Sequence, residues 1–338
     1  MIAYVARRLL LALLTTWIIS VLAFVIIQLP EGDAASKLLD RMMGNDAASD
    51  FRPEMAAGLR SYLGLDRPMH VRYLMWMWNM TRGDFGRSYN PGVYVDHGQK
   101  PVREVIGDRL WTTVALTGFT ILFTWTMAIP IGIYSAVRQH SVGDYVFTFV
   151  GFSGLAVPDF LLGLVLMYIA FAYFDQNVGG LFSADYAAAP WSLAKAWDMV
   201  KHLWIPAVVL GTSGTAGLIR VMRNNLLDEL GKPYVVTARA RGVRSWRLVL
   251  KYPVRVAANP LVSTVGYLLP TLVSGSVIVS VVLSLPTLGP VLLDAILIQD
   301  VQLAGLIVLA LGVLTILGTL ISDILLAVVD PRIKLFDQ

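Results

Sequence analysis

Long apolar segments recur along this chain from its beginning to its end. The six longest cover residues 9–29, 111–137, 145–174, 203–219, 261–285 and 301–329. A helix needs about 20 mostly apolar residues to cross a hydrocarbon layer about 30 Å thick, and all but the fourth segment reach that length. The segments do not alternate between apolar and polar residues, so they favour helices over the strands of a membrane barrel. The pattern therefore predicts an all-α integral membrane protein with six transmembrane helices.

The composition supports this class of protein. Of the 338 residues, 56% are hydrophobic and only 15% are charged, and the mean hydropathy is +0.65. Soluble domains carry about 45–50% apolar and about 25% charged residues, which argues against a disordered tail, a collagen-like fibre and an ordinary cytosolic enzyme. The net charge of +4 is too small to suggest a nucleic-acid-binding protein. Because the chain has no cysteine, it has no disulfide, thiolate metal site or cysteine nucleophile.

The distribution of lysine and arginine predicts the orientation in the membrane. In short loops these residues are enriched on the cytoplasmic side. Nine of them lie between residues 220 and 255, together with only two acids, whereas residues 175–202 and 286–300 together carry five acids and two bases. Further basic residues lie on the predicted cytoplasmic side at Arg7, Arg8, Arg138, Arg332 and Lys334. With six spans, this distribution predicts that both termini are cytoplasmic.

The first apolar segment is preceded by Arg7 and Arg8, as in a secretory signal peptide. It is too long for one, and no small-x-small cleavage site follows, so we expect an uncleaved transmembrane helix within residues 1–30. Residues 31–108 would then form a large extracytoplasmic insertion between helices 1 and 2. The turn at Gly64-Leu65-Asp66-Arg67-Pro68 and the aromatic run at 73–78 predict that it is folded.

Two interpretations of the insertion stay open. It contacts a partner protein, or it only caps the outer ends of the helices. Its aromatic residues are Trp76, Trp78, Phe85, Tyr89 and Tyr94, and its tip lies near residues 90–97.

The basic loop over residues 221–259 has a sequence pattern that its positive charge alone does not explain. After a break at 231–233 comes a short helical turn of small residues, then Gly242, then an amphipathic segment. Its predicted apolar side is formed by Val243, Trp246, Val249 and Leu250, and its polar side by Arg244, Arg247 and Lys251. A solvated basic turn accounts for the charges, but not for an Ala/Gly helix bracketed by two prolines.

Within this loop, Thr237-Ala238-Arg239-Ala240-Arg241-Gly242 resembles the cytoplasmic coupling loop of ABC-importer permeases, in their dipeptide, oligopeptide and nickel branch. Motifs along almost the whole chain resemble the same family, at residues 64–68, Tyr73, 82–88, 109–113, 130–136, Asp144, 157–160 and 330–332. Two positions depart from the pattern: Val236 stands where many ABC importers have Glu, and Arg255 where a Pro is expected. Loss of that Glu is frequent in the peptide branch, so the departure favours that branch.

The resemblance implies a type I ABC-importer permease with a core over residues 109–330 and a cytoplasmic tail over 331–338. In such permeases a short cytoplasmic helix docks into a groove on a separate ATPase subunit, whose ATP-driven closure moves the membrane helices. The docking helix needs small residues for close approach, a glycine at its end and an aromatic anchor. The residues implied at this contact are Thr237, Ala238, Arg239, Ala240, Arg241, Gly242, Arg244 and Trp246.

The resemblance also implies partners in the inner membrane of a bacterial cell. They are a second homologous permease, two ABC ATPase subunits, identical or paired, and an extracytoplasmic solute-binding protein, within the surrounding lipid. Gly231-Lys232 is followed by Pro233 and builds no phosphate loop, so we expect no cofactor on this chain, with ATP and Mg bound by the ATPase subunits. The implied cargo is an oligopeptide or dipeptide, with oligosaccharides or opine-like solutes as alternatives. Nickel is disfavoured because no His/Asp/Glu cluster lies at membrane depth.

Two other classes of protein are alternatives. Gly151-Phe152-Ser153-Gly154 and residues 211–214 match the Gly-x-Ser-Gly pattern of rhomboid-like intramembrane proteases, but no histidine lies inside a predicted span, and His202 reaches only a span's edge. Small residues that let helices pack closely explain the pattern better. An ion-coupled secondary transporter needs ionisable groups at membrane depth, and only Asp159 and Asp323 qualify. A capping role for Asp159 beside Pro158 is the alternative.

The translocation path is expected to be lined by weakly polar residues that let a solvated solute pass. The candidates are Ser153, Asp159, Tyr267, Ser274 and Ser276, with Pro270 and Gly275 as a hinge of the fifth span. Small polar residues also serve helix packing, and the sequence does not show which way they face.

Overall fold

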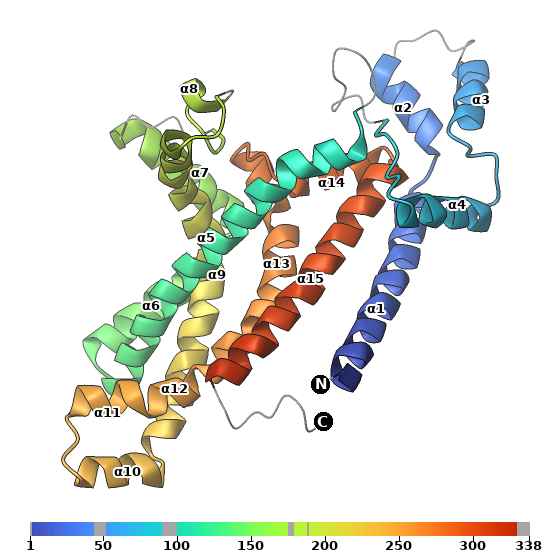
Figure 1. The fold of residues 1–338 in the computed structure, drawn as a ribbon. Helices are drawn as coiled ribbons and strands as arrows, with labels where there is room; N and C mark the ends of the chain where they lie inside the picture. The colour runs from blue at the N-terminus through green and yellow to red at the C-terminus, as the bar shows by residue number, and fades with distance from the viewer. Residues whose placement is uncertain (1, 44–51, 90–99, 175–178, 188, 330–338) are drawn as a thin grey trace. The chain divides into compact units, whose positions relative to one another are not determined.

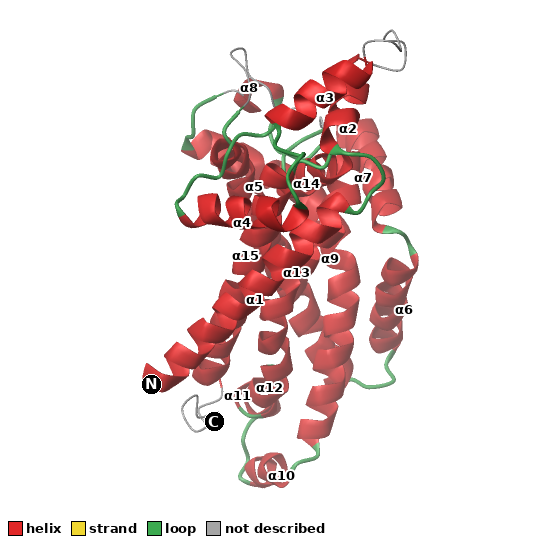
Figure 2. Ribbon diagram, turned by 90° about the vertical axis from the view of Figure 1, so that its right-hand side faces the viewer, coloured by secondary structure: helices red, strands yellow, loops and turns green. Residues whose placement is uncertain are grey.

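A computed structural model describes residues 2–43, 52–89, 100–174, 179–187 and 189–329 (Figure 1). This part of the chain is helical, with loops between the helices (Figure 2). Its strand-like pairing is one isolated bridge between Arg87 and Pro101. The helices are α1 (Ile2–Gln28), α2 (Ala34–Met43), α3 (Arg52–Tyr62), α4 (Met69–Thr81), α5 (Val102–Val137), α6 (Val142–Ala156), α7 (Asp159–Phe174), α8 (Ala184–Ala187), α9 (Leu193–Leu230), α10 (Pro233–Ala240), α11 (Ser245–Lys251), α12 (Pro253–Ala257), α13 (Asn259–Val282), α14 (Leu288–Leu297) and α15 (Val301–Val329).

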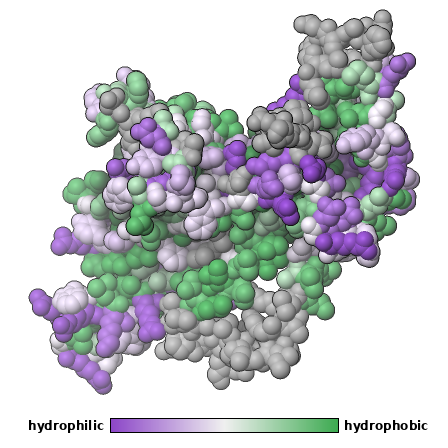
Figure 3. All heavy atoms as spheres, turned by 45° about the horizontal axis from the view of Figure 1, so that its top comes forward, coloured by the Kyte–Doolittle hydropathy of each residue, from purple (hydrophilic) through white to green (hydrophobic). Residues whose placement is uncertain are grey.

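The predicted all-α membrane class is confirmed. Among the described residues, four helices are long and apolar enough to cross a membrane, and the pair α6 and α7 would make a fifth span if it counts as one. The predicted span over 261–285 coincides with α13, but the side chains of residues 265–276 lie outside the described part. The count of six therefore stays a prediction. Many apolar side chains remain exposed, among them Leu122 and Phe149, as expected for surfaces that face lipid (Figure 3).

The segment 145–174 was predicted as one span with a local break at Pro158, and the break is present. The segment forms two helices, α6 and α7, which are bent by 105° at residues 157–158. Val157 has the extended angles φ −88° and ψ 127°, because the ring of the following Pro158 disfavours the helical conformation of the residue before it. The bend therefore follows from Pro158.

The fourth predicted span was too short. The apolar segment 203–219 is the middle of the 38-residue helix α9, so residues 220–230 belong to this helix and not to the loop. Ser192 caps its N-terminus by accepting a hydrogen bond from the Lys195 N–H. Polar side chains in the first turns of α9 form hydrogen bonds within the chain. Asp198 accepts two hydrogen bonds of 2.8 Å from Ser183, and the Lys195 ammonium donates to the Ala189 carbonyl.

The chain forms two compact units, and unit 1 comprises residues 1–112 and 287–313. Its core joins α1, α4, the first turns of α5, α14 and the start of α15. Phe24, Trp76, Val102, Leu288 and Leu303 are each at most 3% exposed there. The sequence predicted only a loop over 286–300, and this was wrong because ten of these residues form the apolar helix α14.

Unit 2 comprises residues 113–286 and 314–338, and α9 is its central helix, packed against α6, α7, α12 and α13. Glycines permit the closest approaches. A Cβ atom on Gly132 of α5 would lie 2.7 Å from the Met222 Cβ, and one on Gly154 of α6 would lie 2.4 Å from the Thr212 Cγ2. The helices can lie this close only because these positions carry no side chain.

Candidate functional site: the loop between α9 and α13

The predicted break after α9 is present. Gly231 ends α9, Lys232 is extended, and Pro233 occupies the first turn of α10, where its missing N–H costs no hydrogen bond. One side chain of α10, Val235, is fully buried. Its neighbours Tyr234 and Val236 are 40% and 56% exposed, so most of the helix surface is exposed to solvent.

The C-terminus of α10 is closed by the predicted glycine. Gly242 has φ +75°, its N–H donates to the Arg239 carbonyl at 3.0 Å, and the Val243 N–H donates to the Ala238 carbonyl at 3.3 Å. This pair of bonds is the Schellman motif, which needs a left-handed residue that glycine adopts without strain. A Cβ atom at Gly242 would meet nothing within 4 Å. The glycine is therefore required by backbone conformation and not by lack of space.

The helix α11 shows a different buried side from the one predicted. Leu248 is buried and Val249 half-buried, whereas Trp246 and Leu250 are 52% and 51% exposed. The predicted apolar stripe thus splits, because α11 buries Leu248 and leaves Trp246 and Leu250 exposed. The exposed Trp246 ring lies 5.2 Å from the Arg247 guanidinium carbon. It is available as an aromatic anchor, the role predicted for it.

The loop is held firmly at its base. α10 contacts α11, α11 contacts α12, and α12 packs on α9. Ala257 of α12 shares a buried cluster with Met222 and Leu226 of α9 and with Leu261 of α13. Because packed cores resist deformation, a displacement of α10 and α11 would also displace the long helices α9 and α13.

An ion pair that the sequence did not predict fixes α6 to the same end of α9. Arg223 donates from Nε and Nη2 to the two carboxylate oxygens of Asp144, at 3.1 and 3.0 Å. The His140 N–H donates to the same carboxylate at 3.0 Å. Asp144 is buried, so this bidentate pair is shielded from solvent. An acid three residues after the capping Ser141 was the available signal.

A second missed cluster lies in unit 1 around the buried Asp300. Its carboxylate accepts hydrogen bonds from the Ser88 hydroxyl at 2.7 Å, the Tyr89 N–H at 3.1 Å and the Leu303 N–H at 3.1 Å. The Tyr89 hydroxyl donates to the Gln299 carbonyl at 2.6 Å. Burial raises the pKa of Asp300 to about 6, although these hydrogen bonds oppose the shift. The cluster ties residues 88 and 89 of the insertion to the start of α15.

The predicted residues of the translocation path are not brought together by any contact in the described part. Ser153 is exposed on α6, and Asp159 opens α7 beyond the bend. Tyr267, Ser274 and Ser276 belong to α13, but their side chains lie outside the described residues. So do the tip at 90–97 and the motif at 330–332. The facing of these residues stays a prediction.

The protease pattern has a packing role. Gly151 and Gly154 of α6 lie against Ala216 and Thr212 of α9. Ser213 follows His202 by 11 residues on the same helix, which separates them by about 16 Å, too far for a serine–histidine pair. The His202 Nδ1 lies 2.8 Å from the Asp198 carbonyl oxygen. The helix-packing interpretation of the small residues is confirmed for these two glycines.

Comparison with known proteins assigns both parts of the chain to one kind of system. Residues 128–335 match the family described as binding-protein-dependent transport system inner membrane component, and residues 1–117 match the N-terminal model of such membrane components. The oligopeptide transport system permease protein AppB of Bacillus subtilis is 34% identical, with 99% of this chain and all of that protein covered. The dipeptide transport system permease protein DppB of Escherichia coli is 30% identical, with 99% of both chains covered.

Two further similarities point the same way. The glutathione transport system permease protein GsiC of Salmonella choleraesuis is 31% identical over 99% of both chains. Among solved structures, a chain of the inward-facing MetNI methionine ABC transporter matches with a TM-score of 0.52 and 18% identity, over 68% of this chain and 99% of that one. This last similarity concerns the fold alone.

Proposed function

The chain belongs to the family of binding-protein-dependent transport system inner membrane components, and from this premise we propose that it forms half of the translocation pathway of an ATP-driven importer. It is a multi-pass inner-membrane transport subunit and not an enzyme. The energy for transport comes from partner subunits, because the sequence contains no phosphate-binding loop of its own.

The observation that carries the proposal is the loop between α9 and α13. α10 presents an exposed surface of small and basic residues, while Val235 and Leu248 are buried and Ala257 belongs to a buried cluster of unit 2. A loop whose outer surface is exposed and whose inner side is buried can transmit the movement of a bound partner to the membrane helices. Thr237 to Gly242, with Arg244 and Trp246, form the contact with the ATPase in this proposal.

The proposed assembly contains a second homologous permease, two ABC ATPase subunits and an extracytoplasmic solute-binding protein. ATP and Mg bind to the ATPase subunits. A dependence on a binding protein is supported by the family description. The stoichiometry follows from the sequence resemblance, in which each permease supplies half of the pore.

The proposed cargo is a peptide. This is supported by relatives that are named for oligopeptide, dipeptide and glutathione transport and that match along almost the entire chain. Oligosaccharides and opine-like solutes remain the alternatives, because the binding protein sets much of the specificity in such systems.

The proposed topology has six spans with both termini cytoplasmic, α6 and α7 together forming the third span. It is supported by nine basic residues between 220 and 255 and by the acidic excess in the loops 175–202 and 286–300. Residues 31–108 are then extracytoplasmic, and the loop between α9 and α13 faces the cytoplasm.

The test is reconstitution. The chain, its companion permease and the ATPase subunits are inserted into liposomes with ATP inside or outside, and uptake of labelled peptide is measured with and without the binding protein. The proposal requires uptake that depends on both ATP and binding protein. Uptake by this chain alone, driven by an ion gradient, would contradict it.

A further inference from the structure

Unit 1 contains a small pocket. It has a volume of about 160 Å³ and lies between the turn after α3, one side of α4 and the start of α15. Two arginines, Arg67 and Arg72, are among its lining residues, and none of the lining residues that the structure describes is acidic. The pocket is therefore a cationic site without a built-in counter-ion.

The sequence motif Gly64-Leu65-Asp66-Arg67-Pro68 builds this pocket. Gly64 has φ +67°, and α3 ends in hydrogen bonds from the Leu65 N–H to the Arg60 carbonyl and from the Gly64 N–H to the Ser61 carbonyl. Pro68 then opens α4. Arg67 lies on the connection and Arg72 on the first turn of α4, so the two short helices bring both arginines to the same pocket.

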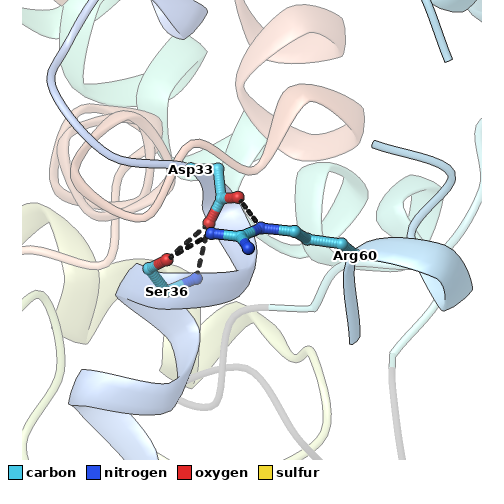
Figure 4. A network of polar contacts seen from close by, with 3 residues as sticks. All are labelled: Asp33, Ser36 and Arg60. Atoms are coloured by element: carbon cyan, nitrogen blue, oxygen red, sulfur yellow. Dashed lines mark hydrogen bonds and ion pairs between the residues drawn. The ribbon is translucent and has the colours of Figure 1, made fainter. Parts of the chain in front are cut away.

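Arg72 is half-buried, and this burial lowers the pKa of its guanidinium. The carboxylate whose charge opposes this shift is that of Asp33. Asp33 is already engaged, since it accepts hydrogen bonds from the Ser36 N–H and hydroxyl and from Arg60 (Figure 4). Burial alone would raise the pKa of Asp33, but these bonds hold it below its usual value, so the carboxylate stays charged and paired with Arg60.

Arg67 likewise has no carboxylate partner among the described residues. Its Nη1 donates to the sulfur of Met75, which is a weak acceptor. A guanidinium presents its N–H groups as a planar fork that fits a carboxylate with two parallel hydrogen bonds. Two such forks at one pocket, one of them already partly desolvated, favour the entry of an anionic group.

We infer that this pocket receives the carboxylate of an acidic side chain of the solute-binding protein. The inference rests on the proposed function, which places residues 31–108 outside the membrane. A site for an entire small molecule usually measures about 300–1,000 Å³. A pocket of about 160 Å³ instead fits the tip of a side chain carried by a larger body. Part of the desolvation of Arg72 has already occurred in the free chain, so less remains to oppose binding.

The test measures the affinity of the purified solute-binding protein for the complete transporter in nanodiscs. Arg72→Met removes the charge while keeping an apolar side chain of similar length. Arg82→Met is the matched control, because Arg82 also belongs to the α4 region but stacks over Trp78 and does not line the pocket. We expect Arg72→Met to weaken binding by about tenfold or more, and Arg82→Met by less than about threefold.

A double-mutant cycle identifies the carboxylate. Surface acids of the binding protein are changed one at a time to the corresponding amide, against the wild-type permease and against Arg72→Met. One position should weaken binding to the wild type and cause no further loss with Arg72→Met. Arg72→Lys, which keeps the charge, should recover part of the affinity, and Arg67→Met supplies a second test if Arg72→Met assembles poorly.

Equal binding by the Arg72→Met and Arg82→Met complexes would overturn the inference. So would a loss in Arg72→Met that couples to no acidic position, because the arginine would then act only within its own fold. If the wild-type complex bound no solute-binding protein at all, the proposed function itself would fail, and this inference with it.

Discussion

Substitution of Gly242 tests how the end of α10 serves coupling. In its left-handed conformation at φ +75°, a residue with a side chain is strained by roughly 1–2 kcal/mol, and a β-branched residue by more. Because a Cβ atom there meets nothing within 4 Å, the cost comes from backbone conformation alone. The series Gly242→Asn, Gly242→Ala and Gly242→Val should therefore be graded, since asparagine tolerates this region best.

The expected damage is local. A strain of about 2 kcal/mol is small beside a typical folding stability of about 5–15 kcal/mol, so membrane insertion and assembly should persist. It exceeds the worth of either closing hydrogen bond, about 0.5–1.5 kcal/mol each, so the last turn of α10 should open in Gly242→Val. This turn carries Ala240 and Arg241, two of the residues proposed to meet the ATPase.

The assay is binding-protein-stimulated ATP hydrolysis by the reconstituted complex, together with transport. Stimulation should be nearly retained in Gly242→Asn, reduced in Gly242→Ala and lost in Gly242→Val. Gly58→Val is the matched control, because Gly58 is an exposed helical residue of α3 with the same free space around it. Normal stimulation and transport in Gly242→Val would refute the reasoning.

Three further predictions concern the packing and the buried charges. Asp144→Asn should lower the unfolding free energy of the purified chain by about 1–3 kcal/mol, because it leaves Arg223 without its carboxylate. In thermal unfolding, the double variant with Arg223→Gln should lose less stability than the two single variants lose together. Additive losses would contradict the ion pair. Gly154→Ala should cost about 1–3 kcal/mol, since its Cβ would lie 2.4 Å from the Thr212 Cγ2, and Thr212→Ser, which removes that methyl group, should restore the melting temperature. The pKa of Asp300 is about 6 in the folded chain and about 3.9 in the unfolded chain, so the folded state binds this proton more tightly. This tighter binding contributes about 3 kcal/mol to the free energy of unfolding. The contribution is fully present below pH 4 and is lost as the pH rises through 6. Unfolding measured from pH 4 to pH 7 should show this decline in the wild type and not in Asp300→Asn, and parallel profiles would contradict it.

The sequence predicted those features that depend on local chemistry. The apolar segments located the long helices, and Gly242 was expected to end the docking helix, because a left-handed terminus needs glycine. The break before Pro233 was predicted for the same kind of reason. Membership of the transport family was predicted from a series of motifs that occur in order along the chain. No single motif would have been specific enough.

Features that depend on distant contacts were missed. Asp300 and Ser88 form a hydrogen bond although 212 positions separate them in the chain. A single sequence contains no sign that these two residues are in contact. The helix α14 is short and apolar, and its burial depends on α1 and α4, so a loop was predicted there. The buried side of α11 was predicted from spacing, but the folded chain buries Leu248 instead.

The central claim is that the exposed surface of α10 is covered by an ATPase subunit. The chain contains no cysteine, so Ala240→Cys introduces a single reactive thiol on that surface. Its rate of labelling by a maleimide is measured in the detergent-solubilised permease with and without the ATPase subunits, against Leu193→Cys at the exposed start of α9. The account predicts that the ATPase slows labelling at position 240 at least about tenfold and leaves position 193 unchanged. Equal labelling at position 240 in a complex that transports would contradict it.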